Sequence, residues 1–273
     1  DAIRRVDVMS FYSQSLAPEN TILGIVGDFD PAQMKGLIAD RLGEWECDDL
    51  MEIGTPPTGD QQKAGLFVVD QPQLTQSSIL IGHIGGELRN PYHASMAVLN
   101  EVLNGFGGRL FNEIRSRQGL AYSVYAYWSA RYAHKGIFIG GGQTRSEATV
   151  PFNESMYREL DKVREEPISD TELAFAKDSV LNSFVFNFQT PSQTLSRLIR
   201  YEYYGYPSDF VFKFRDQVEQ ATAEEVLTAA QTNLMPDQLI TLVVGNPAEI
   251  TPELETLGVP ITPLDVTIPE PSA

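Results

Sequence analysis

Hydrophobic and polar positions between residues 66 and 139 follow the periods of strands and helices. Residues 66–69 and 77–84 run apolar or alternate, which predicts two strands. Residues 90–103 open with an Asn-Pro pair and carry apolar side chains at helical spacing, which predicts a helix. Aromatic and aliphatic residues at 122–128 and 135–139 predict a further pair of strands.

A block of helices follows this predicted sheet. Residues 149–163 are amphipathic, and a capping box formed by Ser169 and Glu172 opens the next helix. Further helices are predicted over 192–234, before a closing strand at 239–244. This order indicates an α+β fold, in which a mixed or antiparallel sheet carries helices packed on one face.

The first segment of the chain has the pattern of the end of a larger unit. It predicts a helix over 2–15, a Pro-containing turn, a strand over 21–26 and a helix over 32–42. Roughly 45 residues cannot enclose a core unaided. The order helix, Pro turn, strand, Gly recurs with an offset of 218 residues, which is the separation of Pro18 from Pro236. An internal duplication is therefore expected in the full-length protein, with most of the first copy preceding this chain.

These patterns divide the chain into four parts. Residues 1–52 are predicted to be the tail of a preceding, incomplete α/β repeat. Residues 53–64 contain Pro and Gly in the proportion typical of a linker. Residues 65–248 are predicted to form a complete α/β domain. Prolines recur through 249–273, which is therefore expected to be an irregular tail.

Composition excludes several classes of protein. The 273 residues carry a formal net charge of −17, which argues against binding to nucleic acid or to an anionic membrane surface. The charge is compatible with basic partners such as cationic peptides, and equally with an acidic surface that keeps the protein in solution. Cys47 is the single cysteine, so an intramolecular disulfide is impossible. No apolar run approaches the roughly 18 residues that a membrane span requires.

The most informative stretch runs over residues 103–128, where a glycine-rich turn precedes a short helix and an aromatic strand. Gly119 is expected to end the helix in a left-handed conformation. Arg115 lies in the last turn of that helix and Tyr122 at the start of the strand, so the two side chains can lie together. They would then present a planar fork of N–H donors and a phenol that can hydrogen-bond a developing oxyanion. Alternatively, Arg115 covers the helix C-terminus and Tyr122 packs.

This stretch resembles the C-terminal-domain signature of the pitrilysin/insulinase family of zinc metallopeptidases, which includes the mitochondrial processing peptidases. The matching residues are Arg109, Leu110, Phe111, Ile114, Arg115, Gly119, Leu120, Ala121, Tyr122, Ser123 and Val124. The resemblance implies that Arg115 and Tyr122 hold substrate and transition state at a zinc site on another domain. It also implies that the turn containing Gly105, Gly107 and Gly108 borders the substrate chamber.

A zinc site is not expected on this chain. The family motif H-x-x-E-H places two imidazoles one helical turn apart beside a glutamate base. The chain has 3 histidines, His83, His93 and His134, and none is paired at that spacing. We interpret His93 as a surface or capping histidine, and both the turn at 105–108 and the run at 140–142 as tight backbone turns, since neither completes a phosphate-binding motif. Zinc is expected on the missing domain or on a partner subunit.

Two functions follow from these observations. In the first, which the resemblance implies, the chain would be the substrate-binding part of a zinc endopeptidase that cleaves extended peptides, and would be inactive alone. Alternatively, it is a catalytically silent assembly or scaffold subunit, such as the core subunits of respiratory complex III. Expected partners are a peptide and a zinc-bearing domain or subunit of the same family, with a dimer as the full-length form. The sequence leaves the compartment open between cytoplasm and periplasm.

Overall fold

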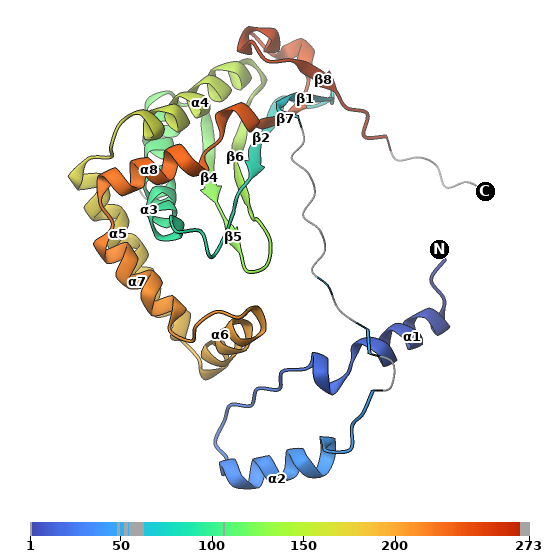
Figure 1. Ribbon diagram of the computed structural model, residues 1–273. Helices are drawn as coiled ribbons and strands as arrows, with labels where there is room; N and C mark the ends of the chain where they lie inside the picture. Colours follow the sequence, from blue (N-terminus) through green and yellow to red (C-terminus); the bar gives the residue numbers. More distant parts are fainter. Residues whose placement is uncertain (1, 48–49, 52–53, 55–62, 106, 268–273) are drawn as a thin grey trace. The chain divides into compact units, whose positions relative to one another are not determined.

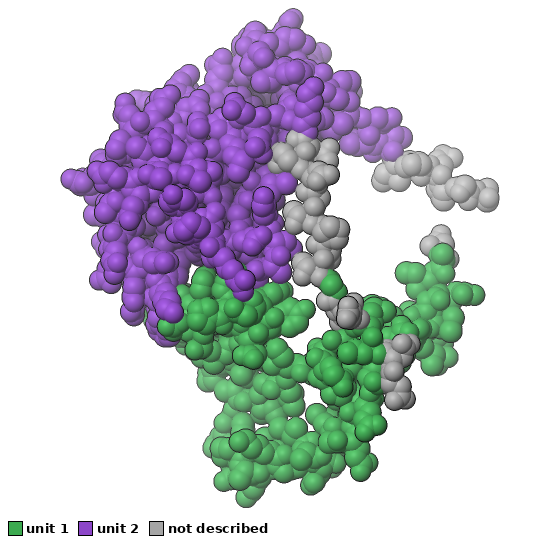
Figure 2. Space-filling view, viewed as in Figure 1, with its two compact units in different colours: residues 1–57, 185–210 green, residues 58–184, 211–273 purple. Residues whose placement is uncertain are grey.

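Two compact units make up the chain in the computed structural model, which describes residues 2–47, 50–51, 54, 63–105 and 107–267. The smaller unit comprises residues 1–57 and 185–210, and the larger comprises 58–184 and 211–273 (Figure 2). The predicted linker at 53–64 lies outside the described residues except at positions 54, 63 and 64. The predicted domain at 65–248 differs from the larger unit chiefly because residues 185–210 group with the smaller one.

A mixed six-stranded sheet with the strand order β4-β6-β2-β7-β1-β8 forms the centre of the larger unit (Figure 1). Its strands are β1 (Gly65–Asp70), β2 (Gln76–Ile84), β4 (Ala121–Trp128), β6 (Ile137–Arg145), β7 (Ile240–Gly245) and β8 (Ile261–Pro263). The pairings of β2 with β6 and β7, and of β4 with β6, are antiparallel, whereas β1 runs parallel to β7 and β8. Two short strands, β3 (Gly86–Glu87) and β5 (Ala130–Arg131), pair separately. The predicted mixed sheet is confirmed.

Helices cover one face of this sheet (Figure 1). The helices of the larger unit are α3 (His93–Asn104), α4 (Thr149–Glu165), α5 (Asp170–Phe184), α7 (Phe210–Gln220, from its second residue) and α8 (Ala223–Asn233). Strand β2 shows why one face is covered: Ile79 and Ile81 are each 1% exposed, whereas Leu80 between them is 41% exposed. Because successive strand residues point to opposite faces, the alternation places the core on the helical side. The predicted one-sided packing of helices is therefore confirmed.

The glycine run at 140–142 lies in the middle of strand β6, so its interpretation as a tight backbone turn is wrong. A Cβ atom on Gly140 would lie 3.1 Å from the Met156 side chain, and one on Gly142 would lie 3.0 Å from Phe152. Both partners belong to α4. The glycines therefore allow α4 to pack closely on the sheet.

The C-terminal segment, expected to be irregular, contributes regular structure to the larger unit. Strand β8 pairs with β1 at one edge of the sheet, and the 3-10 turns η6 (Pro247–Glu249) and η7 (Leu254–Leu257) precede it. Ile250 and Leu254 are buried in the main core. The prediction was wrong because prolines do not exclude an edge strand. One side of an edge strand has no neighbouring strand, so a proline there removes no hydrogen bond of the sheet.

The smaller unit contains α1 (Arg5–Ser15), α2 (Pro31–Leu42), the 3-10 turn η4 (Val185–Phe188) and α6 (Pro191–Tyr204). Asp30 caps α2 as expected, because its carboxylate accepts hydrogen bonds from the N–H groups of Ala32 and Gln33 at 2.9 and 2.8 Å. Residues 21–26 do not form the predicted strand. A strand is held by backbone bonds to a neighbouring strand, and no strand in the described ranges pairs with this segment.

The two segments of the expected repeat have matching local structure. Helices α1 and α8 are both 11 residues long, and each is followed by a 3-10 turn that starts with proline: η1 (Pro18–Asn20) and η5 (Pro236–Gln238). After the second turn the chain enters β7 and pairs with β1 and β2. The duplication of the full-length protein remains a prediction.

Candidate functional site

The short helix after the glycine-rich turn is a π-helix, η2 (Phe111–Arg117). At the end of this helix the Gln118 N–H donates to the Glu113 carbonyl, five residues earlier, at 3.0 Å. This spacing distinguishes a π-helix from an α-helix, in which the acceptor lies four residues earlier. Gly119 then adopts φ +63°, which confirms the predicted left-handed end, and the chain enters β4. The helix and the strand are therefore joined by a turn that folds them back against each other.

This turn brings Arg115 and Tyr122 together. The guanidinium carbon of Arg115 lies 4.5 Å from the centre of the Tyr122 ring and 4.8 Å from the centre of the Phe111 ring. Both distances are within the range of a cation–π contact. Arg115 is half-buried, whereas Tyr122 is 82% exposed. The aromatic rings thus fix the direction of the guanidinium while the phenol faces solvent.

Arg115 differs from the other arginines of the same stretch in its charge environment. Arg109 binds Glu172 through two hydrogen bonds of 2.6 and 3.1 Å, and Arg117 pairs with Glu113. Arg115 makes no ion pair or hydrogen bond with any residue in the described part of the chain. Its N–H donors are therefore available to an external carbonyl or carboxylate group, for which the planar guanidinium is well suited.

Tyr122 also lines a polar hollow of ≈270 Å³. Gln76, Gln143 and Arg145 contribute polar side chains to the same hollow. Arg145 is held by Glu147 at 2.8 Å, so its charge is already compensated. A polypeptide lying beside Tyr122 would thus meet amide groups as well as the guanidinium of Arg115.

The predicted turn is present at its described residues, Gly105, Gly107 and Gly108. Gly108 donates its backbone N–H to the Gly105 carbonyl, and Gly107 has φ +87°. The side-chain amide of Asn112 donates to the Gly107 carbonyl. The turn thus connects α3 to η2 through tight backbone geometry, while the part of Gly105, Gly107 and Gly108 in binding substrate remains a prediction.

Two asparagines of α3, which the sequence did not single out, hold the outer edge of β4. The Asn104 amide binds the N–H and the carbonyl of Ala126 at 2.8 and 2.6 Å. The Asn100 amide binds the same groups of Trp128, at 2.9 Å each. These asparagines are four residues apart, the spacing at which H-x-x-E-H places its two imidazoles. In α3 that spacing serves to anchor a strand.

Removing one of these amides is expected to destabilise the larger unit. Asn104→Ala leaves the buried backbone groups of Ala126 without their partners, which costs about 1–3 kcal/mol in the free energy of unfolding. Urea denaturation measures the loss, and Asn182→Ala, an exposed asparagine of α5, is the matched control. Equal stabilities of the two variants would contradict the anchoring role.

The Arg109–Glu172 ion pair connects the segment before η2 to the first turn of α5. Hydrogen bonds from Arg109 lower the pKa of Glu172 to about 2, against the opposing effect of burial, and bonds from Ser169 lower it further. Ser169 donates its N–H to Glu172 at 2.9 Å, and its hydroxyl accepts the Glu172 N–H at 3.3 Å, which confirms the predicted capping box. Arg109 therefore stabilises the helix that follows the site.

This pair predicts a pH dependence of stability. Because the pKa of Glu172 is lower in the folded than in the unfolded chain, its contribution is present above the ordinary value of 4.5 and is lost as the pH falls towards about 2. Glu172→Gln is expected to cost about 1–2 kcal/mol at neutral pH, and this cost should shrink steadily as the pH falls from 4.5 through about 2. Denaturant unfolding of both proteins across this range measures the difference, and a constant difference would contradict the assignment.

The histidines of this chain do not fit a zinc site. The Nδ1 of His83 is bonded to the Ile84 carbonyl at 2.8 Å, and its Nε2 accepts the Met235 N–H at 3.2 Å. His93, interpreted as a surface or capping histidine, is half-buried at the first residue of α3 with its ring against Phe214, and burial lowers its pKa to about 4. Within the described ranges no group of three or more His, Cys, Asp or Glu side chains could hold a metal ion. The location of zinc elsewhere remains a prediction.

No helix in the described part of the chain is both long and apolar enough to cross a lipid bilayer.

Comparison with known proteins identifies the family. Residues 2–180 match the family described as "Peptidase M16 inactive domain". An uncharacterized zinc protease of Mycobacterium tuberculosis is 27% identical over 236 residues, which cover 83% of this chain and 52% of the relative. A relative from Helicobacter pylori, named a non-peptidase homolog, is 25% identical over 161 residues, covering 59% of this chain and 37% of that protein. The chain thus spans about half the length, or less, of these relatives.

A solved structure supports the same assignment at the level of the fold. The peptidase M16 inactive domain from Pseudomonas fluorescens superposes with a TM-score of 0.77 at 22% sequence identity, over 90% of this chain and 58% of that chain. The resemblance inferred from residues 109–124 is confirmed by the family match, which includes them. This chain belongs to the peptidase M16 family and carries its inactive C-terminal domain.

Proposed function

We propose that this chain is the substrate-binding part of a zinc-dependent endopeptidase, in which Arg115 and Tyr122 hold an extended peptide. The observation that carries the proposal is the Arg115 guanidinium, fixed between two aromatic rings and without a carboxylate partner in the described part of the chain. The zinc-protease name of the Mycobacterium tuberculosis relative supports the reaction class.

The two side chains have complementary parts in this proposal. The N–H groups of Arg115 bind a peptide carbonyl or carboxylate, which fixes the position of the substrate. The phenol of Tyr122 donates a hydrogen bond to the oxygen that becomes negative when the peptide carbonyl is attacked. The turn at Gly105, Gly107 and Gly108 borders the bound peptide.

Metal and general base belong to another domain or subunit in this proposal, because the described residues of this chain offer no group of side chains that fits zinc. The natural partner is a zinc-bearing unit of the same family, and the full-length form is a dimer. The isolated chain is therefore expected to bind peptide without cleaving it.

Site-specific crosslinking tests the peptide-binding role. The photoreactive residue p-benzoylphenylalanine is placed at Tyr122 in the full-length protein together with its zinc-bearing part, and an extended peptide substrate is added before irradiation. We expect a peptide adduct at this position and none when the same residue replaces the exposed Tyr203 of α6. Equal labelling at both positions, or none at either, would refute the proposal.

A catalytically silent assembly subunit is the second candidate function. One observation favours it, since the relative from Helicobacter pylori is named a non-peptidase homolog. The two candidates differ in whether the full-length protein or its partner carries H-x-x-E-H. Sequencing the adjoining coding region distinguishes them, because absence of the motif from both would favour the silent subunit.

A further inference from the structure

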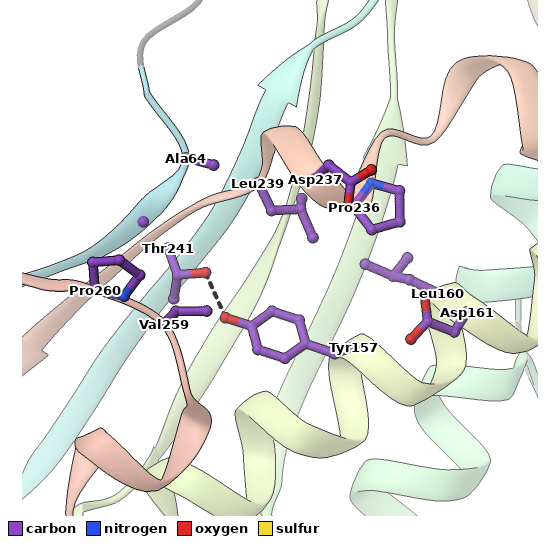
Figure 3. Close-up of a pocket in the computed structure, with 11 residues that line it drawn as sticks. Ala64, Tyr157, Leu160, Asp161, Pro236, Asp237, Leu239, Thr241, Val259 and Pro260 are labelled. Atoms are coloured by element: carbon purple, nitrogen blue, oxygen red, sulfur yellow. Dashed lines mark hydrogen bonds between the residues drawn. The ribbon is translucent and has the colours of Figure 1, made fainter.

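A cavity of ≈350 Å³ lies at the end of the sheet where β1 and β7 begin (Figure 3). It is formed by Ala64 and Gly65, by α4, by the η5 turn and the first residues of β7, and by Val259 and Pro260 before β8. All of these residues belong to the larger unit. Its volume is near the lower end of the range for small-molecule sites, which favours a small ligand over a dinucleotide.

The walls of this cavity are mainly apolar. Figure 3 shows Leu239 and Pro236 facing the ring of Tyr157, with Leu160 beside them. The Gly65 N–H donates to the Leu239 carbonyl at 3.2 Å. Because these two backbone groups are already bonded to each other, a ligand would be recognised by the side chains of the cavity.

Hydroxyl and carboxylate groups supply the polarity of the cavity. The Tyr157 and Thr241 hydroxyls are 2.6 Å apart and bind each other (Figure 3). Burial raises the pKa of Tyr157, so the phenol stays neutral at physiological pH. Asp161 and Asp237 are exposed at the side formed by Leu160 and Pro236, and neither makes an ion pair with any residue the structure describes.

The charge of the lining is one-sided. Two carboxylates border the cavity, and no Lys, Arg or His is among the described residues that line it. An anionic ligand would be repelled by this arrangement, whereas a cation on an apolar body would match both the carboxylates and the walls.

We propose that this cavity binds a small organic cation, with an aliphatic body between the apolar walls and an ammonium or guanidinium group at Asp161 and Asp237. The same chemistry is presented by a free alkylamine and by a lysine side chain of a peptide. The cavity is formed by α4, η5, β7 and the segment before β8, whereas Arg115 and Tyr122 lie on η2 and β4. The inference is therefore independent of the proposed peptidase function.

Titration calorimetry with n-hexylammonium chloride tests this proposal on the full chain, with hexanoate and hexanol as probes of the same length. We expect saturable binding of hexylammonium, weaker binding of hexanol and none of hexanoate. Asp161→Asn combined with Asp237→Asn should weaken hexylammonium binding by about tenfold, as expected for loss of charge-assisted contacts. Glu154→Gln, which removes an exposed charge from the same helix α4, should leave it unchanged.

Several outcomes would overturn the proposal. These are the absence of saturable hexylammonium binding up to about 10 mM, equal binding of hexanoate, and unchanged affinity of the double variant. NMR shift changes at the methyl groups of Ala64 and Thr241 should accompany binding, and changes confined to other parts of the chain would likewise contradict it. A lysine with both main-chain ends blocked, binding as tightly as hexylammonium, would identify a peptide side chain as the source of the cation.

Discussion

Replacing Arg115 by alanine in the zinc-bearing full-length protein is expected to lower kcat/KM for peptide cleavage by roughly 10–1000-fold, the scale of losing a group that positions the substrate for reaction. The reason is the position of the guanidinium, which Phe111 and Tyr122 fix at 4.8 and 4.5 Å while its N–H groups stay available. Steady-state cleavage of an extended fluorogenic peptide measures the effect.

Arg117→Ala is the matched control, because Arg117 lies on the same helix η2 but is already paired with Glu113. Its kcat/KM should change by less than about twofold, because the charge of Arg117 is already compensated by Glu113. Arg115→Lys keeps the charge and loses the planar fork, so it should recover only part of the activity. Unchanged cleavage by Arg115→Ala, or equal losses in Arg115→Ala and Arg117→Ala, would remove Arg115 from the substrate site.

Gly141→Ala is expected to destabilise the larger unit by about 3 kcal/mol or more, because backbone strain and overpacking combine. Gly141 has φ +154° in the middle of β6, and a Cβ atom there would overlap the Ile79 carbonyl of the neighbouring strand β2. Backbone atoms of a central strand cannot move aside as a flexible side chain can. Chemical denaturation followed by circular dichroism measures the loss.

Gly119→Ala separates the two causes of this destabilisation. Gly119 also has a positive φ, +63°, but no atom lies within 4 Å of a Cβ built there. Its substitution should therefore cost only the left-handed backbone strain, about 1–2 kcal/mol. If Gly141→Ala costs no more than Gly119→Ala, close contact with β2 is not what requires glycine at position 141.

The sequence predicted the elements whose periodicity is strong. The alternation at 77–84 and the helical spacing at 90–103 correspond to β2 and α3, and the capping box opens α5 as expected. The proximity of Arg115 and Tyr122 could also be predicted, because a glycine that ends a helix in the left-handed conformation reverses the chain between them.

Features that depend on distant residues could not be predicted. Asn100 and Asn104 have the spacing of an ordinary polar helix face, and only the packing of α3 on β4 shows that they bind a strand edge. The strand predicted at 21–26 does not form, because a local sequence pattern does not supply the neighbouring strand that it would need. The contact that half-buries His93 could not be predicted, because its partner Phe214 lies far along the chain.

The π-helical form of η2 could not be predicted from the sequence pattern either. Its apolar positions fit an α-helix equally well, and the difference of one residue per hydrogen-bonded ring leaves no distinct periodicity in seven residues. Such wider turns are frequent at functional sites, and this one carries Arg115.

The most direct measurement combines peptide cleavage with zinc content in the Arg115→Ala, Tyr122→Phe double variant of the zinc-bearing full-length protein. If this chain binds the peptide while another unit binds the metal, kcat/KM of the double variant falls by roughly 100-fold or more. Its zinc stoichiometry stays that of the unmodified protein. Undiminished cleavage, or loss of zinc together with activity, would contradict that division of roles.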